Sequence, residues 1–283
     1  MENKSKKGFV VYFSPAGTTR HVAEVIKSML DDTGCSTEIF DLGRKEDFQR
    51  LEIAQESFSA GDSLWIGSPV YTYHALPLIT EFIAGLPRDR GVFAVPFVTW
   101  GAVSSGLALS EMGRQLEAKG YHLAGAAKIA ALHSLLWQVK DPLGAGRPDG
   151  IDDLLIGDLV KKVYAKINSS KFRVYPLENL NYQPAPAQKV MQEMSLEKAK
   201  PMFPKIEADK DLCSQCGACV KVCPVQAISC SPYPQIGDKC IYCFNCVRLC
   251  KENAFKIDLS PFGDRLRGMA AENNEQPLSK IFV

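Results

Sequence analysis

Apolar, strand-like runs alternate with helix-like patterns along residues 8–167. The first run, GFVVYFS at 8–14, is nearly continuous, as expected for a strand buried on both faces. Similar runs predict five strands, at 8–14, 36–42, 62–70, 91–101 and 122–132. Apolar residues at helical spacing predict a helix after the first strand that ends at Gly34, and further helices at 76–86, 107–120 and 151–167. This alternation predicts an α/β fold with a doubly wound, five-stranded parallel sheet.

The turn after the first strand, SPAGTT at 14–19, lies where such sheets bind ligands, at the carboxyl end of a strand. It has no lysine for a Walker loop, and Gly17 alone cannot form a three-glycine dinucleotide fingerprint. The free N–H groups of the helix start can still hold a phosphate monoester, which suits FMN. A plain helix cap without a ligand is the alternative. The residues predicted to hold the phosphate are Ser14, Pro15, Ala16, Gly17, Thr18 and Thr19.

A change in composition predicts a second domain. Prolines at 176, 184 and 186, with little periodicity around them, indicate a linker or a segment lying on a surface. Nine of the ten cysteines follow it, between Cys213 and Cys250. We therefore expect a first domain at 1–169, a linker at 170–204, a second domain at 205–260 and a tail at 261–283. The tail has no motif, and we expect it either to pack over the second domain or to stay mobile.

The cysteines form two CxxCxxCxxxC runs, 27 residues apart, which indicates an internal duplication. In this spacing three cysteines of one run hold one iron–sulfur cluster, and the fourth ligates the other cluster. The spacing predicts two [4Fe-4S] clusters. The first has the ligands Cys213, Cys216, Cys219 and Cys250, and the second has Cys240, Cys243, Cys246 and Cys223.

Structural zinc and a disulfide framework explain these runs less well. Zinc sites favour CxxC pairs separated by a spacer, and disulfides need an oxidising compartment. The second run also departs from the usual pattern, with Lys251 in place of proline and Phe244-Asn245 in place of a glycine-containing pair. We expect Cys35 and Cys230, outside both sets of ligands, to be buried free thiols.

Charge and hydropathy exclude several classes of partner. Lys and Arg number 33 against 32 Asp and Glu, so the chain lacks the basic surface that nucleic acid selects. The basic start MENKSKK runs directly into a strand and does not resemble a signal peptide. No apolar run reaches the roughly 18 residues that a membrane span needs. We therefore expect a cytoplasmic protein without a membrane span.

The sequence YFSPAGTTR resembles the phosphate loop of flavodoxin-like FMN proteins, with Ala16 where those proteins commonly have a hydroxyl. The resemblance implies that the flavin ring lies between the loops after the third and fourth strands. Trp65 lies within a strand and is assigned to the core, and His74 is interpreted as an ordinary loop histidine rather than a proton donor. The implied ring contacts are Pro69, Val70, Tyr71, Tyr73, Thr99, Trp100 and Gly101.

Residues 205–260 resemble bacterial two-cluster ferredoxins, and the whole chain resembles the flavodoxin/ferredoxin fusion proteins of anaerobes. The resemblance implies an electron-transfer protein that uses FMN, two [4Fe-4S] clusters and an unidentified protein redox partner. The leading alternative is an FMN-dependent reductase that takes electrons through the clusters and reduces a small molecule at the flavin; a docking scaffold that has lost FMN is a third hypothesis. No acid/base pair supports the reductase. The oligomeric state is left open, with a homodimer as one option.

Overall fold

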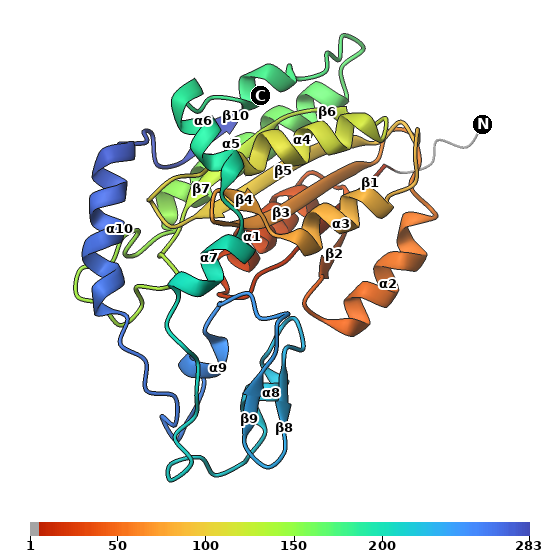
Figure 1. The fold of residues 1–283 in the computed structure, drawn as a ribbon. Helices are drawn as coiled ribbons and strands as arrows, with labels where there is room; N and C mark the ends of the chain where they lie inside the picture. The colour runs from red at the N-terminus through yellow and green to blue at the C-terminus, as the bar shows by residue number, and fades with distance from the viewer. Residues whose placement is uncertain (1–5) are drawn as a thin grey trace.

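The computed structural model describes residues 6–283; the start of the basic segment, residues 1–5, lies outside the described residues. A sheet with strand order β10-β7-β5-β3-β1-β2 forms the centre of the larger domain (Figure 1). Its parallel strands are β1 (Lys7–Tyr12), β2 (Ser36–Asp41), β3 (Ser63–Tyr71), β5 (Phe93–Trp100) and β7 (Ala126–Ala130). Counted among themselves, these five have the order 2-1-3-4-5, which is the flavodoxin-like order. The predicted fold class is confirmed.

Helices cover both faces of this sheet (Figure 1). Side chains of β1 alternate between two cores, since Phe9 and Val11 join one and Val10 joins the other. Trp65 is fully buried in the second core, as predicted. The first core contains residues of α2 (Lys45–Gln55), α3 (Pro77–Gly85) and α4 (Ala108–Ala118), and the second contains residues of α1 (Thr18–Asp32) and α5 (Gly150–Ile167). The sequence pattern did not predict α2, because it buries only Leu51.

The fifth predicted strand is divided in two. Its first part, β6 (His122–Leu123), pairs with the start of β5, and its second part is β7. Gly125 separates them, and a Cβ there would lie only 2.7 Å from the carbonyl oxygen of Phe282. The close approach of the C-terminal strand therefore requires glycine at this point.

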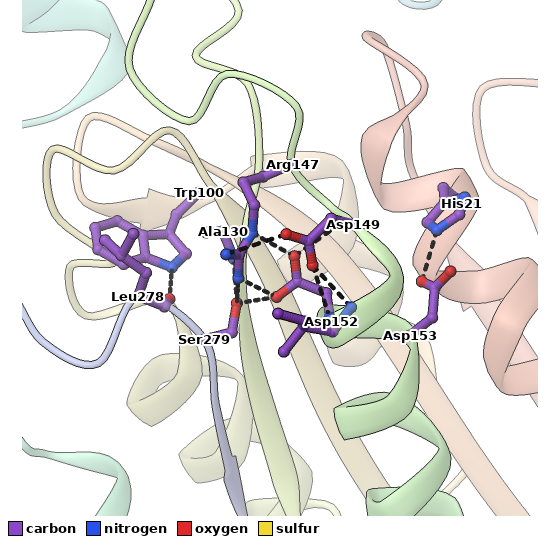
Figure 2. Close-up of polar contacts among 10 residues, drawn as sticks. His21, Trp100, Ala130, Arg147, Asp149, Asp152, Asp153, Leu278 and Ser279 are labelled. Atoms are coloured by element: carbon purple, nitrogen blue, oxygen red, sulfur yellow. Dashed lines mark hydrogen bonds and ion pairs between the residues drawn. The ribbon is translucent and has the colours of Figure 1, made fainter.

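The tail returns to the first domain instead of packing only on the second. After α10 (Ser260–Asn273), the strand β10 (Lys280–Phe282) pairs antiparallel with β7. Figure 2 shows the connection: the Trp100 indole N–H donates to the Leu278 carbonyl at 2.8 Å, and the Ala130 N–H donates to Ser279 Oγ at 2.9 Å. The sheet therefore gains an edge strand that the sequence pattern did not predict, because three residues are too few to show a strand period.

The linker lies on the first domain, and the second domain forms a separate lobe (Figure 1). Leu180 of the linker is buried in the first core, and Phe244 of the second domain packs in a third core with Leu136.

No helix among residues 6–283 is long and apolar enough to cross a membrane. The remaining elements are β4 (His74–Ala75), η1 (Leu177–Leu180), α6 (Ala185–Glu193), α7 (Leu196–Ala199), η2 (Lys200–Met202), α8 (Ala218–Lys221), β8 (Ile228–Cys230), β9 (Pro234–Ile236) and α9 (Asn245–Arg248).

Candidate functional site

Residues 14–19, called here the phosphate loop, join the carboxyl end of β1 to the start of α1. Gly17 caps the helix at a positive φ of 93°, and no atom lies within 4 Å of the position that a Cβ would take there. Ser14 Oγ accepts a hydrogen bond from the Arg20 N–H at 2.9 Å. The N–H groups of Thr18 and Thr19 begin the helix and have no partner within it. The loop therefore presents amides and the positive end of a helix dipole to an anion.

Two cavities adjoin each other beside the phosphate loop. The small cavity, of about 30 Å³, is lined by many of the predicted contacts: Pro15, Ala16, Thr18, Thr19, Pro69, Val70, Tyr71, Thr99, Trp100 and Gly101. The large cavity, of about 200 Å³, is lined by Tyr73 and shares Val70, Tyr71, Gly101 and Ser134 with the small one. The structure thus brings together the loops after β1, β3 and β5.

The loop after β3 is a two-residue hairpin turn. Thr72 and Tyr73 have positive φ values of 47° and 75°, and Tyr71 pairs with His74 of β4. Positive φ at both central residues defines a type I′ turn, which usually contains glycine or asparagine. The Tyr73 carbonyl accepts a hydrogen bond from the Leu107 N–H at 2.7 Å. This bond holds the turn against the start of α4.

His74 links this turn to the linker. Its Nδ1 lies 2.6 Å from Glu111 Oε1, and its Nε2 lies 2.9 Å from the carbonyl oxygens of Met191 and Met194. The hydrogen bond to Glu111 raises the pKa of His74. Since both ring nitrogens have protein partners, His74 has a structural role, in agreement with its interpretation as an ordinary loop histidine.

Of the three aromatic residues predicted to contact the ring, Tyr71, Tyr73 and Trp100, the last is largely covered by the tail. Its indole is 2% exposed and donates a hydrogen bond to Leu278 (Figure 2). Lys128 Nζ lies 5.0 Å from the centroid of its ring. Tyr71 lines both cavities, and its Oη is buried without a hydrogen-bond partner among residues 6–283. Burial raises the pKa of Tyr71, and the nearby Cys243 adds to the increase. Tyr71 therefore brings an unsatisfied hydroxyl group to the site.

The loop after β7 also lines the cavities, and the sequence pattern did not single it out. It contributes Ala131, Leu132 and Ser134 to the small cavity and His133 to the large one. Burial lowers the pKa of His133 to about 4, so its ring is neutral at neutral pH. A Cβ on Gly101 would lie 2.5 Å from the His133 ring, which explains glycine there. The sequence could have indicated this loop, because the fifth parallel strand ends at the same edge of the sheet as the other four.

The cysteines gather into the two predicted sets. Cys213, Cys216, Cys219 and Cys250, the first cysteine group, line one cavity of about 20 Å³ together with Cys230. The second cysteine group consists of Cys223, Cys240, Cys243 and Cys246. Burial raises the pKa of Cys246, and the other three cysteines of the group are near enough to raise it further. Cys230 is exposed, so the expectation that it is a buried thiol is wrong. Among residues 6–283, no three Cys, His, Asp or Glu side chains converge closely enough for a single metal ion.

The backbone repeats the duplication seen in the sequence. Positive φ values recur 27 residues apart, at Gln215 and Tyr242 and again at Gly217 and Phe244. The sulfur of Cys223 accepts a hydrogen bond from the Ala227 N–H, and that of Cys250 accepts one from the Ala254 N–H. The two cysteine loops thus have equivalent conformations.

Where the second run departs from the first, it contacts the larger domain. Phe244 adopts the left-handed conformation that Gly217 has in the first run, and its ring is 1% exposed, 6.0 Å from that of Trp137. Burial of this ring offsets the cost of a positive φ for a residue with a side chain. Asn245 Nδ2 donates a hydrogen bond to the Pro15 carbonyl in the phosphate loop. The unusual Phe244-Asn245 pair therefore joins the two domains.

Comparison with known proteins supports an iron–sulfur segment. Residues 206–229, which include the first run, match the family of 4Fe-4S binding domains. The chain thus combines a domain with flavodoxin-like strand order and a 4Fe-4S binding segment, and it has a redox role. No curated protein matches the chain in sequence.

Several solved structures are similar to part of the chain. One is the rubredoxin:oxygen oxidoreductase of the anaerobe Desulfovibrio gigas (19% identity, TM-score 0.42, covering 58% of this chain and 37% of that one). Another is a flavodoxin from the domain Archaea (18%, 0.43, 58% and 99%), and a third is apo NADH:FMN oxidoreductase EmoB (18%, 0.43, 59% and 92%). The chain thus spans little more than a third of the length of the first of these.

Proposed function

We propose that this chain moves single electrons between two [4Fe-4S] clusters, FMN and a protein redox partner. The observation that carries the proposal is the position of the second cysteine group. Ile241 and Tyr242, which lie between Cys240 and Cys243, line the large cavity beside the phosphate loop. A cluster on these cysteines and a flavin in the cavities would then be neighbours.

The residues at the two cavities fit FMN. The amides of Thr18 and Thr19 would hold the phosphate, and Tyr71 and Tyr73 would flank the ring. The unpartnered Tyr71 hydroxyl supports this assignment, because buried polar groups normally have a partner. The clusters would supply one-electron transfer, and FMN one- or two-electron transfer. The protein would hold these groups close together and exclude water between them.

The two cysteine groups differ in exposure, which suggests their order. Cys243 and Cys246 of the second group are buried, whereas Cys216 of the first group is exposed. The second group therefore serves the flavin side, and the first group serves the protein partner at the surface. The direction of electron flow follows from the partner and not from this arrangement.

A reductase acting on a small molecule is the second candidate, favoured by the neutral His133 in the large cavity. The surroundings of His133 weigh against it. Its Nδ1 already accepts a hydrogen bond from the Leu135 N–H at 3.2 Å, and the sequence offers no acid/base pair to accompany it. Electron transfer is therefore the function we propose.

The proposal is tested by mixing the oxidised protein, under anaerobic conditions, with different reductants. A reduced low-potential ferredoxin should bleach the flavin and cluster absorbance rapidly, because single electrons can enter at the first cysteine group. NADH and NADPH should not, since the chain has no glycine fingerprint for a nicotinamide dinucleotide. Rapid bleaching by either nucleotide would favour the reductase instead.

Iron analysis should give about eight iron atoms per chain, as expected for two four-iron clusters. Cys216→Ser should remove about half of this iron, and Cys243→Ser the other half, because each belongs to a different cysteine group. Cys35→Ser is the matched control, because Cys35 lies next to β2, away from both groups, and should lose none. Zinc in place of iron in anaerobically prepared protein would overturn the cluster assignment.

FMN should bind in preference to FAD, and Thr19→Ala should weaken its binding by about 0.5–1.5 kcal/mol, the value of one neutral hydrogen bond. Thr19 Oγ1 lies 2.7 Å from Thr99 Oγ1, so the substitution also loosens the phosphate loop from β5. Thr33→Ala, at the far end of the same helix, is the control. Titration of flavin-free protein with FMN gives both affinities, and an unchanged value for Thr19→Ala would show that the phosphate site is misplaced.

A further inference from the structure

Arg248, at the end of α9, carries a charge that no carboxylate balances among the described residues. Its Cζ lies 4.8 Å from the centroid of the Trp137 ring, and its Nη2 donates a hydrogen bond to the Cys243 carbonyl. Its Nε is buried without a hydrogen-bond partner among residues 6–283. Tyr71 Oη, in the wall of both cavities, is a second buried atom without a partner among these residues.

A buried guanidinium is costly unless an anionic group lies nearby. Arg248 lies two residues after Cys246, and its Nη2 donates to the carbonyl of Cys243. Cysteines bind iron as thiolates, so the ligand sulfurs of the proposed second cluster would be the anionic groups beside the guanidinium.

The duplication contains an internal comparison. Lys221 ends α8 at the position that Arg248 occupies in α9, 27 residues later. Lys221 is exposed to solvent, where water screens its charge, whereas Arg248 lies under Trp137 of the larger domain. Only the second half of the duplication therefore places a desolvated positive charge beside its cysteines.

We propose that Arg248 is a positioning residue for electron transfer: its fixed charge favours the reduced form of the second cluster over that of the first. This inference rests on the proposed function. Reduction transfers one electron from a one-electron donor protein to the cluster, with no bond formed or broken, and increases its negative charge. A desolvated guanidinium stabilises that added charge. Arg248 thus directs electrons to the cluster beside the flavin cavity.

The test is an anaerobic redox titration of the complete protein with dithionite, followed by the electron paramagnetic resonance of both clusters. Cys216→Ser, which keeps only the second cluster, identifies the corresponding signal. Arg248→Gln should shift the equilibrium of the second cluster toward its oxidised form by roughly tenfold, about 59 mV for one electron. Arg248→Lys should restore most of the shift, because it keeps the charge. Lys221→Gln should leave both midpoints unchanged.

The outcomes separate the inference from the function on which it rests. Wild-type protein without two four-iron clusters would overturn the proposed function and the inference together. With both clusters present, equal midpoints in Arg248→Gln and wild type would overturn the inference alone. A lower melting temperature in Arg248→Gln and Arg248→Lys alike, without a change in midpoint, would show that Arg248 only joins the domains. Iron content measured in each variant ensures that a shift does not reflect cluster loss.

Discussion

Replacing Lys128 with methionine is expected to weaken the attachment of the C-terminal segment by about 3–5 kcal/mol, the cost of removing one partner of a buried ion pair. Lys128, on β7, is 1% exposed, and its Nζ lies 2.5 Å from Glu275 Oε1. Glu275 also accepts hydrogen bonds from the Ser105 N–H at 2.9 Å and from Gln183 Nε2 at 3.0 Å. Without Lys128, a buried carboxylate would lose its only cation among the described residues.

Hydrogen exchange of peptides covering residues 274–283 measures this effect directly, because it reports the free energy of local opening. Glu275→Gln tests the other partner, and it keeps the acceptor for Ser105. The double variant Lys128→Met/Glu275→Gln should open less readily than the sum of the single effects predicts, since it leaves no unpaired charge. Strictly additive effects would show that the pair makes no coupled contribution to holding the tail.

This ion pair could not be predicted from the sequence. The positions of the parallel strands and the grouping of the cysteines could be predicted, because both depend on patterns within short stretches of chain. Lys128 and Glu275 are 147 residues apart, and nothing in either segment indicates the partner in the other. Only the pairing of β10 with β7 brings them together, and a strand of three residues has too little pattern to predict.

The candidate site could be predicted in part for the same reason. The loops after β1, β3 and β5 line the cavities because parallel strands end at one edge, which strand order makes predictable. The walls supplied by the linker and α10, such as Met194 and Leu266, depend on how distant segments pack. Phe244 and Asn245 stood out only as departures from the cysteine pattern. The domain contact that they form gives those departures a physical reason.

Substitution of Gly106 by alanine should have the second large effect on stability. Gly106 precedes α4 with a positive φ of 59°, and a Cβ there would lie 2.1 Å from the Tyr73 carbonyl oxygen. The left-handed conformation costs a residue with a side chain roughly 1–2 kcal/mol. Overpacking adds about 1–3 kcal/mol, because the clash is with backbone that cannot rotate away. We expect a total loss of about 2–5 kcal/mol.

Gly34→Ala isolates the conformational part of this loss. Gly34 has a φ of 80° after α1, but no atom lies within 4 Å of a Cβ there, so only the roughly 1–2 kcal/mol of the left-handed conformation should be lost. Melting temperatures from anaerobic calorimetry compare the two, at roughly 2–4 °C per kcal/mol for a domain of this size. Gly106→Ala should also bind less FMN, because the clash displaces the Thr72–Tyr73 turn that lines the large cavity, whereas Gly34→Ala should not. If the two variants melted at the same temperature, the contact between Gly106 and Tyr73 would not be as tight as the structure indicates.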